Sequence, residues 1–255
     1  MIEFPDVPAG EPLSVSASTY VAYRRCPEQA VGRLRGEYPE DSAVGFVGGL
    51  AHRVFARHLQ HGPISKDDFA QACREEIGSS MNPKVGSLGL KPSTLQPIIA
   101  EVGDLYDRFQ KVSLEGCRDV EVSLEFEATE GVVVKGIVDA VFDGEDGGVV
   151  LRDWKTGQVG AVADQLAFYG MLWTLVHGEP PESLDAFSVK TGETYVERPT
   201  RSALQATVTD VARFVTIARQ SFAGVPADTT AGPWCRYCPL LPECSEGRTA
   251  VAVND

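Results

Sequence analysis

The sequence lacks three features that would indicate a membrane protein, a secreted protein or an ATP-driven motor. No stretch of its 255 residues approaches the roughly 20 consecutive apolar residues that a membrane-spanning helix needs. The first fifteen residues, MIEFPDVPAGEPLSV, have neither the basic nor the apolar region of a secretory signal. The G-x-x-x-x-G-K-[ST] phosphate-binding loop is also missing, which argues against a fused ATP-driven motor. We therefore expect a cytoplasmic protein with no membrane partner.

Basic residues are also scarce, since 23 Lys and Arg against 36 Asp and Glu give a net charge of −13. Phosphate binding needs Lys and Arg, so this balance disfavours tight non-specific binding of nucleic acid. Two stretches are nevertheless locally positive, and a groove needs only local potential. Residues 23–35 have four arginines against Glu28, a balance of +3, and residues 198–219 have four against Asp210, again +3. Arg24 and Arg25, in the first stretch, are candidate substrate-binding residues.

The pattern of apolar residues predicts an α/β protein with a central mixed sheet flanked by helices. With 43% hydrophobic residues the chain is long enough for one large core. Helical periodicity and capping residues predict helices over about 16–26, 46–60, 65–77, 93–111, 161–177 and 200–222, after an extended arm at 1–13 and with a turn-rich linker at 79–92. Alternating and β-branched runs predict a β-meander over about 120–155 and a hairpin over 184–199.

Two acids and a lysine on the predicted meander form the candidate catalytic site. Asp139 lies near the end of one apolar strand, and Asp153 and Lys155 lie on the next. Residues i and i+2 of a strand share a face, so Asp153 and Lys155 project to the same side, and the turn between the strands brings Asp139 near them. Two carboxylates suit Mg²⁺ or Mn²⁺, while the lysine can position water or stabilise charge on a phosphodiester.

Four of the six cysteines indicate a metal centre. Cys235-x2-Cys238-x5-Cys244 has the spacing of a metal knuckle that lacks one ligand, and Cys26 is a natural fourth. Spacing alone fits zinc or an iron–sulfur cluster equally well. Such a centre would join the two ends of the chain and stabilise the fold. Cys73 and Cys117 are expected to be buried small hydrophobic residues.

These motifs together resemble the PD-(D/E)XK nuclease superfamily, and in particular its RecB-type branch. Asp139 corresponds to the first acid, in Gly136-Ile137-Val138-Asp139, and Asp153-Trp154-Lys155-Thr156-Gly157 resembles the D-x-K-T-G element of that branch. The resemblance extends from about residue 14 to 247 and implies a restriction-endonuclease-like fold.

The resemblance also assigns roles to residues outside the meander. His52, four positions after Gly48, matches a glycine–histidine motif whose imidazole binds the metal, which tilts the site from Mg²⁺ toward Mn²⁺. Gln165 and Tyr169, one helical turn apart, match a pair that lines the substrate path. The other histidines are expected to be surface or packing residues. Glu121 is either an acid beside the metal or a solvent-facing strand residue, and we favour the second interpretation.

One cysteine before the nuclease core and three after it resemble the AddB-like and CRISPR-associated nucleases that have a [4Fe–4S] cluster. This implies one nuclease domain over 1–255, with a core at 45–222 and a cluster-binding lobe formed by 14–30 and 230–247. It further implies a DNA exonuclease that trims single-stranded ends, with a recombination or CRISPR-type protein as a second partner. Alternatives are a non-catalytic module that binds DNA ends and an unrelated α/β protein stabilised by zinc.

Overall fold

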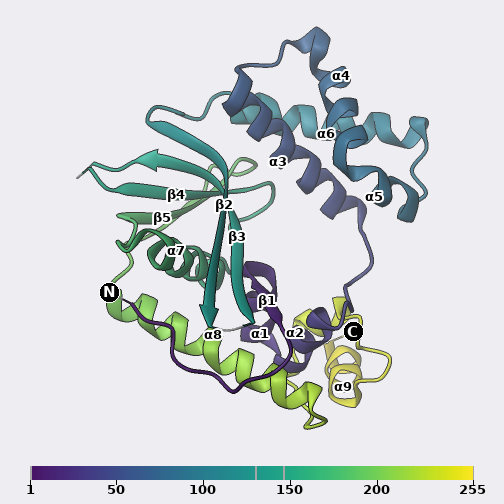
Figure 1. Ribbon diagram of the computed structural model, residues 1–255. Helices are drawn as coiled ribbons and strands as arrows, with labels where there is room; N and C mark the ends of the chain where they lie inside the picture. The colour runs from purple at the N-terminus through teal and green to yellow at the C-terminus, as the bar shows by residue number, and fades with distance from the viewer. Residues whose placement is uncertain (1, 130, 146, 255) are drawn as a thin grey trace.

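The computed structural model describes residues 2–129, 131–145 and 147–254 (Figure 1). In this part of the chain a mixed six-stranded sheet forms, with the order β1-β3-β4-β5-β6 and with β2 paired to β3. The strands are β1 (Leu13–Ser16), β2 (Cys117–Thr129), β3 (Val132–Asp143), β4 (Val149–Lys155), β5 (Ser183–Ser188) and β6 (Thr194–Glu197). β2-β3-β4 is the predicted antiparallel meander and β5-β6 the predicted hairpin, whereas β1 is parallel to β3 and β5 to β4. The expected α/β architecture is confirmed.

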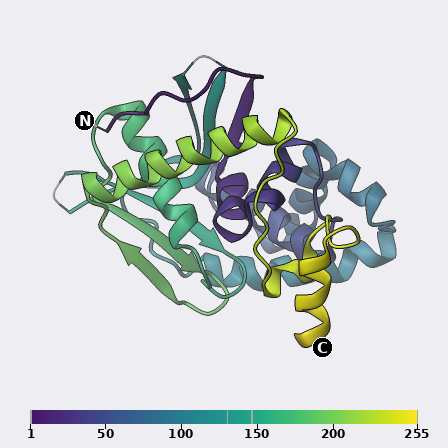
Figure 2. The same cartoon turned by 90° about the horizontal axis from the view of Figure 1, so that it is seen from below.

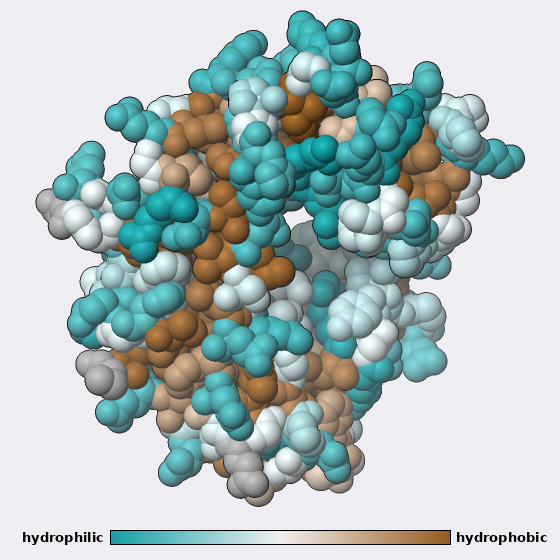
Figure 3. Space-filling model, turned by 45° about the horizontal axis from the view of Figure 1, so that its top comes forward, coloured by the Kyte–Doolittle hydropathy of each residue, from teal (hydrophilic) through white to brown (hydrophobic). Residues whose placement is uncertain are grey.

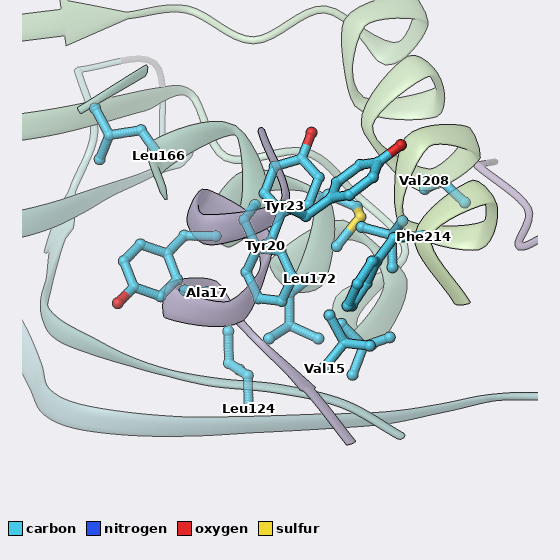
Figure 4. Packing of buried hydrophobic residues seen from close by; sticks show 14 of the residues in the cluster. Val15, Ala17, Tyr20, Tyr23, Leu124, Leu166, Leu172, Val208 and Phe214 are labelled. Carbon is cyan, nitrogen blue, oxygen red and sulfur yellow. The ribbon is translucent and has the colours of Figure 1, made fainter. Parts of the chain in front are cut away.

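One face of the sheet is covered by α1 (Ala17–Arg25), α7 (Ala163–His177) and α8 (Arg201–Phe222). Apolar residues of β1, α1, α7 and α8 form a single buried cluster between these layers (Figure 4). Val15 and Phe214 are fully inaccessible to solvent, and the rings of Tyr23 and Phe214 lie 5.0 Å apart. Short α2 (Pro27–Leu34) follows α1 directly, with proline in its first turn, where the missing amide hydrogen costs nothing.

The opposite face of β3 and β4 packs against a separate group of helices. This helical lobe consists of α3 (Ala43–His61), α4 (Lys66–Glu76), the π-helical turn η1 (Ile77–Met81), α5 (Asn82–Ser87) and α6 (Pro92–Phe109). Trp154 of β4 is buried against it, with its ring 5.2 Å from that of Phe109. The prediction of a turn-rich linker over 79–92 is wrong, since most of this stretch is helical. Met81 within it and Ile77 just before it are buried in the core of the lobe, and this packing stabilises the helical conformation.

The two ends of the chain lie along the lower edge of the molecule in Figure 1. Residues 2–12 contain no helix or strand and run beside α8, where Glu3 and Gln205 exchange two hydrogen bonds of 2.9 Å. After α8 the chain forms the 3-10 turn η2 (Pro233–Tyr237) and α9 (Ser245–Asn254) next to α1 and α2 (Figure 2). The amide of Glu28 donates to the carbonyl of Asp228 at 3.1 Å, so these end segments are in direct contact. Among the helices in the described ranges, none is long and apolar enough to cross a bilayer.

Candidate active site

The candidate site lies where β3 and β4 separate. Their pairing runs from Asp143↔Val149 to Ala140↔Arg152 and stops there, while β4 continues to pair with β5 as far as Lys155. Asp139 directly precedes Ala140 and Asp153 directly follows Arg152, and Ala140↔Arg152 is the last pair that joins the two strands. The two carboxylates are thus held at an open end of the sheet, where no neighbouring strand fills the space between them.

The alternation of side chains along β3 also changes at Asp139. Val134 and Val138 point into the core beneath α7 and α8, but Ala140 points into the core of the helical lobe. Even-numbered residues on one strand would normally share a face, so the strand must kink at Asp139. On β2, Glu121 lies between the partners of Ala140 and Val138, and its φ of +52° lies in the left-handed region. For a residue other than glycine this conformation costs about 1–2 kcal/mol, a strain typical of functional sites.

A closed network of hydrogen bonds fixes the predicted lysine. Lys155 Nζ lies 2.7 Å from Asp153 Oδ2 and donates to Gln165 Oε1 at 2.7 Å. Gln165 Nε2 donates to Asp153 Oδ1 at 2.9 Å and lies 3.2 Å from the hydroxyl of Tyr169. Gln165 and Tyr169 come from one face of α7. This helix therefore sets the positions of both charged groups, and the structure brings together these four predicted residues.

Asp139 is fixed from two other elements. Its Oδ2 accepts a hydrogen bond of 2.8 Å from the backbone amide of Trp154 and lies 3.3 Å from Nδ1 of His52 on α3. α3 can approach β4 this closely because Gly48 has no side chain: a Cβ there would lie 3.2 Å from Oγ1 of Thr156. The predicted Gly48–His52 pair thus brings an imidazole from the helical lobe to the carboxylate of the sheet.

Burial and the charge of a neighbouring carboxylate raise the pKa values of Asp153 and Glu121. Burial, followed by the charge of Asp139, raises the pKa of Asp153 to about 6, although Lys155 opposes the shift. Burial lowers the pKa of His52, but the charge and hydrogen bond of Asp139 outweigh it and the net pKa is raised. Partial desolvation, followed by the charge of Asp139, also raises the pKa of Glu121, although much of its surface stays exposed. A bound cation would relieve this concentration of negative charge.

The residues present fit a divalent cation by their chemistry. Two carboxylates and an imidazole are suitable ligands for Mg²⁺ or Mn²⁺. Oδ2 of Asp153 is buried and accepts no well-aligned hydrogen bond, despite its short distance to Lys155, so a lone pair remains for a ligand. Across the ranges that the structure describes, no three His, Cys, Asp or Glu side chains are already grouped to hold a metal ion. The fit therefore lies in the donor set, not in a preformed coordination shell.

The two predicted arginines of the first basic stretch lie apart. Arg24 is occupied by ion pairs, at 3.1 Å to Asp164 and 2.6 Å to Asp210, and the structure does not bring it to the site. Arg25 instead lines a groove that ends at Gln165 and Tyr169. Glu121 is solvent-exposed, as favoured from the sequence, but its register position places it opposite Asp139. Sequence alternation gives no sign of such a kink.

The four clustered cysteines lie around one cavity of about 340 Å³ between the ends of the chain. Backbone amides donate to three of the sulfurs, from Thr230 to Cys26 at 3.4 Å, from Gly232 to Cys235 at 3.3 Å and from Gly247 to Cys244 at 3.3 Å. The pKa of Cys238 is raised by burial and, among smaller effects, by the other three thiols. Amide donors to sulfur and a shared cavity suit ligating thiolates, so the donor chemistry fits a metal or a cluster.

The two remaining cysteines lie elsewhere. Cys73 is fully buried in the helical lobe, where burial raises the pKa of its thiol to about 12, and Cys117 is half-buried at the start of β2. His58 packs in the same lobe, with Nδ1 2.8 Å from the hydroxyl of Tyr106, and His177 stacks on Trp173. These environments agree with the packing roles expected for them.

Comparison with known proteins identifies the family. The sequence matches the PD-(D/E)XK nuclease superfamily over residues 14–245, and the chain belongs to this superfamily. It is accordingly a nuclease, a hydrolase of a family that uses divalent metals such as Mg²⁺ or Mn²⁺ and acts on DNA. A search of curated proteins found no match.

Two solved structures align with the chain, and the first of them shows the same fold. One, described as "Putative exonuclease" from Eubacterium rectale, aligns with a TM-score of 0.56 and 14% identity over 90% of this chain and 87% of that chain. Another, described as SSO0001, aligns with a TM-score of 0.36 and 16% identity over 77% of this chain and 94% of that chain, too weakly for any comparison of detail.

Proposed function

We propose that the chain is a DNA exonuclease of the RecB-type branch that removes nucleotides from single-stranded ends. One observation carries the proposal: Lys155 is held between Asp153 and Gln165, beside the Asp139–His52 pair, at the open end of β3 and β4. Every position that this chemistry needs is filled by a competent residue. The alternative, a module that binds DNA ends without cutting them, has no comparable support in the site.

The arrangement suits hydrolysis of a phosphodiester. His52, Asp139 and Asp153 would hold the cation, which supplies a Lewis acid that activates water and offsets charge on the phosphate. Lys155 would place its ammonium against the phosphate oxygens, where positive charge stabilises the transition state. Because Gln165 ties Lys155 to Asp153, the ammonium is held in place before substrate arrives.

Nuclease assays test this proposal. We expect release of nucleotides from linear single strands with Mn²⁺ or Mg²⁺, and no cutting of covalently closed single-stranded circles. Lys155→Ala should lower the rate by about 100-fold or more, as for removal of one preorganised charge donor. Lys111→Ala, which removes an exposed lysine beyond the end of α6, is the matched control. Cutting of circles would make the enzyme an endonuclease, and equal rates for Lys155→Ala and wild type would refute the catalytic assignment.

We further propose that Cys26, Cys235, Cys238 and Cys244 bind a [4Fe–4S] cluster with a structural role. The shared cavity and the three amide donors support ligation, and the resemblance to iron–sulfur nucleases favours iron over zinc. Anaerobically purified protein should absorb broadly near 400 nm, a band that zinc cannot give. Cys244→Ser should abolish this absorption and Cys117→Ser should keep it. A colourless protein that contains zinc would contradict the assignment.

A further inference from the structure

A groove of about 650 Å³ leads from α1 and α2 to the candidate site. Its lining includes Arg25 and Arg33 of α1 and α2, Lys135 and Ile137 of β3, and Tyr169 of α7. The space-filling view shows the molecule hollowed near its centre, with hydrophilic residues around much of the hollow (Figure 3).

The basic residues of this groove are not engaged in ion pairs within the described ranges. In the part of the chain that the structure describes, neither Arg25, Arg33 nor Lys135 forms an ion pair. Their neighbours in sequence differ, since Arg24 and Arg35 on the same pair of helices bind carboxylates. The four arginines of residues 23–35 therefore have two roles. Arg24 and Arg35 form ion pairs within the fold, whereas Arg25 and Arg33 line the groove.

Arg33 is an unusual side chain to leave unpaired. It is half-buried, and its Nε is inaccessible to solvent and donates no hydrogen bond. Burial lowers its pKa, and the nearby charge of Arg25 lowers it further. Two like charges held together at a partly buried surface are stabilised by an anion. The only carboxylate on the lining is Glu125, in register with Lys135 but not ion-paired with it, so the lining keeps a charge of +2.

Ile137 connects this groove to the acids of the site. Half of its surface is exposed, and it lines both the groove and a smaller pocket of about 230 Å³ that contains His52 and Asp139. A ligand in the groove can therefore continue past Ile137 to the acids. Exposed apolar surface beside a row of cations suits a chain of phosphates with unpaired bases, whereas in a duplex the base faces are stacked and inaccessible.

We infer that this groove binds single-stranded DNA next to the phosphodiester that is cut, with Arg25 and Arg33 on flanking phosphates and Ile137 against a base. The inference rests on the proposed function and adds to it a binding track and a reason for preferring single strands. Arg33 and Lys135 become substrate-binding residues.

Binding measured without cleavage tests the track. A labelled oligothymidylate of about 15 nucleotides, within the range of single-strand site sizes, is titrated with Ca²⁺ replacing Mg²⁺ and Mn²⁺. Arg25→Gln/Arg33→Gln should weaken binding about tenfold and lower the slope of log K against log salt by about 1.4, or about 0.7 for each lost phosphate contact. Arg198→Gln/Arg213→Gln, which removes the same charge from the second basic stretch, should leave both values unchanged. Equal losses in the two variants would mean general electrostatic attraction and would overturn the inference.

Three further results separate this inference from its alternatives. A blunt duplex of the same length should compete poorly, and equal competition would refute the preference for single strands. The arginine variant should keep the wild-type absorption and metal content, whereas loss of either would mean that Arg33 serves the adjacent cysteines. In cleavage assays its KM should rise while kcat stays within about twofold. If wild type cuts nothing, the proposed function fails, but binding by this variant still decides the inference.

Discussion

The sheet with its covering helices and the cysteine-containing end segment differ in what can stabilise them. Eight residues of α7, from Leu166 to Thr174, are buried. By contrast, within residues 228–253 only Cys235 and Gly247 are buried. The sheet is therefore held by apolar packing, whereas the end segment has almost no core of its own. A segment of this kind depends on cross-links, so ligation of the four cysteines is expected to supply most of its stability.

Truncating a side chain in the packed core should cause the largest loss of stability. Phe214→Ala removes a fully buried ring beside Tyr23 and should lower the free energy of unfolding by about 3–5 kcal/mol. Phe222→Ala, at the exposed end of the same helix, should cost no more than about 1 kcal/mol. Denaturant unfolding followed by far-ultraviolet circular dichroism measures both. Similar losses for the two variants would contradict the assignment of stability to this core.

Removing a cysteine should loosen the end segment alone. In Cys235→Ala, hydrogen exchange of amides in 228–253 should accelerate at least about tenfold, because local opening no longer breaks a ligated centre. Amides of β3 should keep their wild-type protection. Cys73→Ala, which removes a sulfur from the helical lobe, should leave the end segment unaffected. Unchanged exchange in the end segment would show that its packing suffices without ligation.

A single methyl group between β3 and α7 should lower both nuclease activity and stability. A Cβ at Gly136 would lie 3.2 Å from Cε1 of Tyr169 and 3.4 Å from Leu172, so Gly136→Ala should shift the face of α7 that holds Gln165. We expect about a tenfold loss of nuclease activity and a loss of about 1–3 kcal/mol in stability. Gly157→Ala meets no atom within 4 Å and serves as control. Full activity of Gly136→Ala would show that Tyr169 and Gln165 need no exact placement.

The smallest expected effect is the contribution of His58, in the helical lobe, to the pH dependence of the unfolding free energy. Burial lowers the pKa of His58 below its ordinary 6.5, so the folded protein favours the neutral imidazole. The folded pKa is below the unfolded pKa. This contribution to stability is therefore complete above pH 6.5 and is lost as the pH falls through the folded value. His58→Gln should show a flatter decline in unfolding free energy between about pH 7.5 and about pH 5. An identical decline in variant and wild type would assign the effect to other groups.

The acids and the lysine of the site are predictable from the sequence because their placement is local. A turn between two strands and an i, i+2 spacing suffice to bring Asp139, Asp153 and Lys155 together. The parallel pairing of β1 is not predictable in this way, because Leu13 pairs with Val132, far along the chain. No feature of the four residues LSVS requires that partner. α2 and α5 were missed for a related reason, since each is short and carries proline and glycine.

The environment of Glu121 shows what pattern alone does not reveal. Alternation assigns it to the solvent side of β2, and it is indeed exposed. Its left-handed φ arises opposite the kink in β3, a property of two strands together. The division of the four arginines of residues 23–35 into paired and unpaired sets likewise depends on Asp164, Asp210 and Glu28, which only the folded chain brings near.

The position of the cysteines also has a consequence for synthesis of the protein. The three proposed co-ligands of Cys26 begin at Cys235, 209 residues further along the chain. The first strand must likewise wait for β3 before it can pair. Because chains fold progressively as they are made, α1 must wait for α7 and α8, and the four cysteines can bind the proposed centre only after Cys244 has been translated. Insertion of the proposed centre would then follow, and not precede, formation of the sheet.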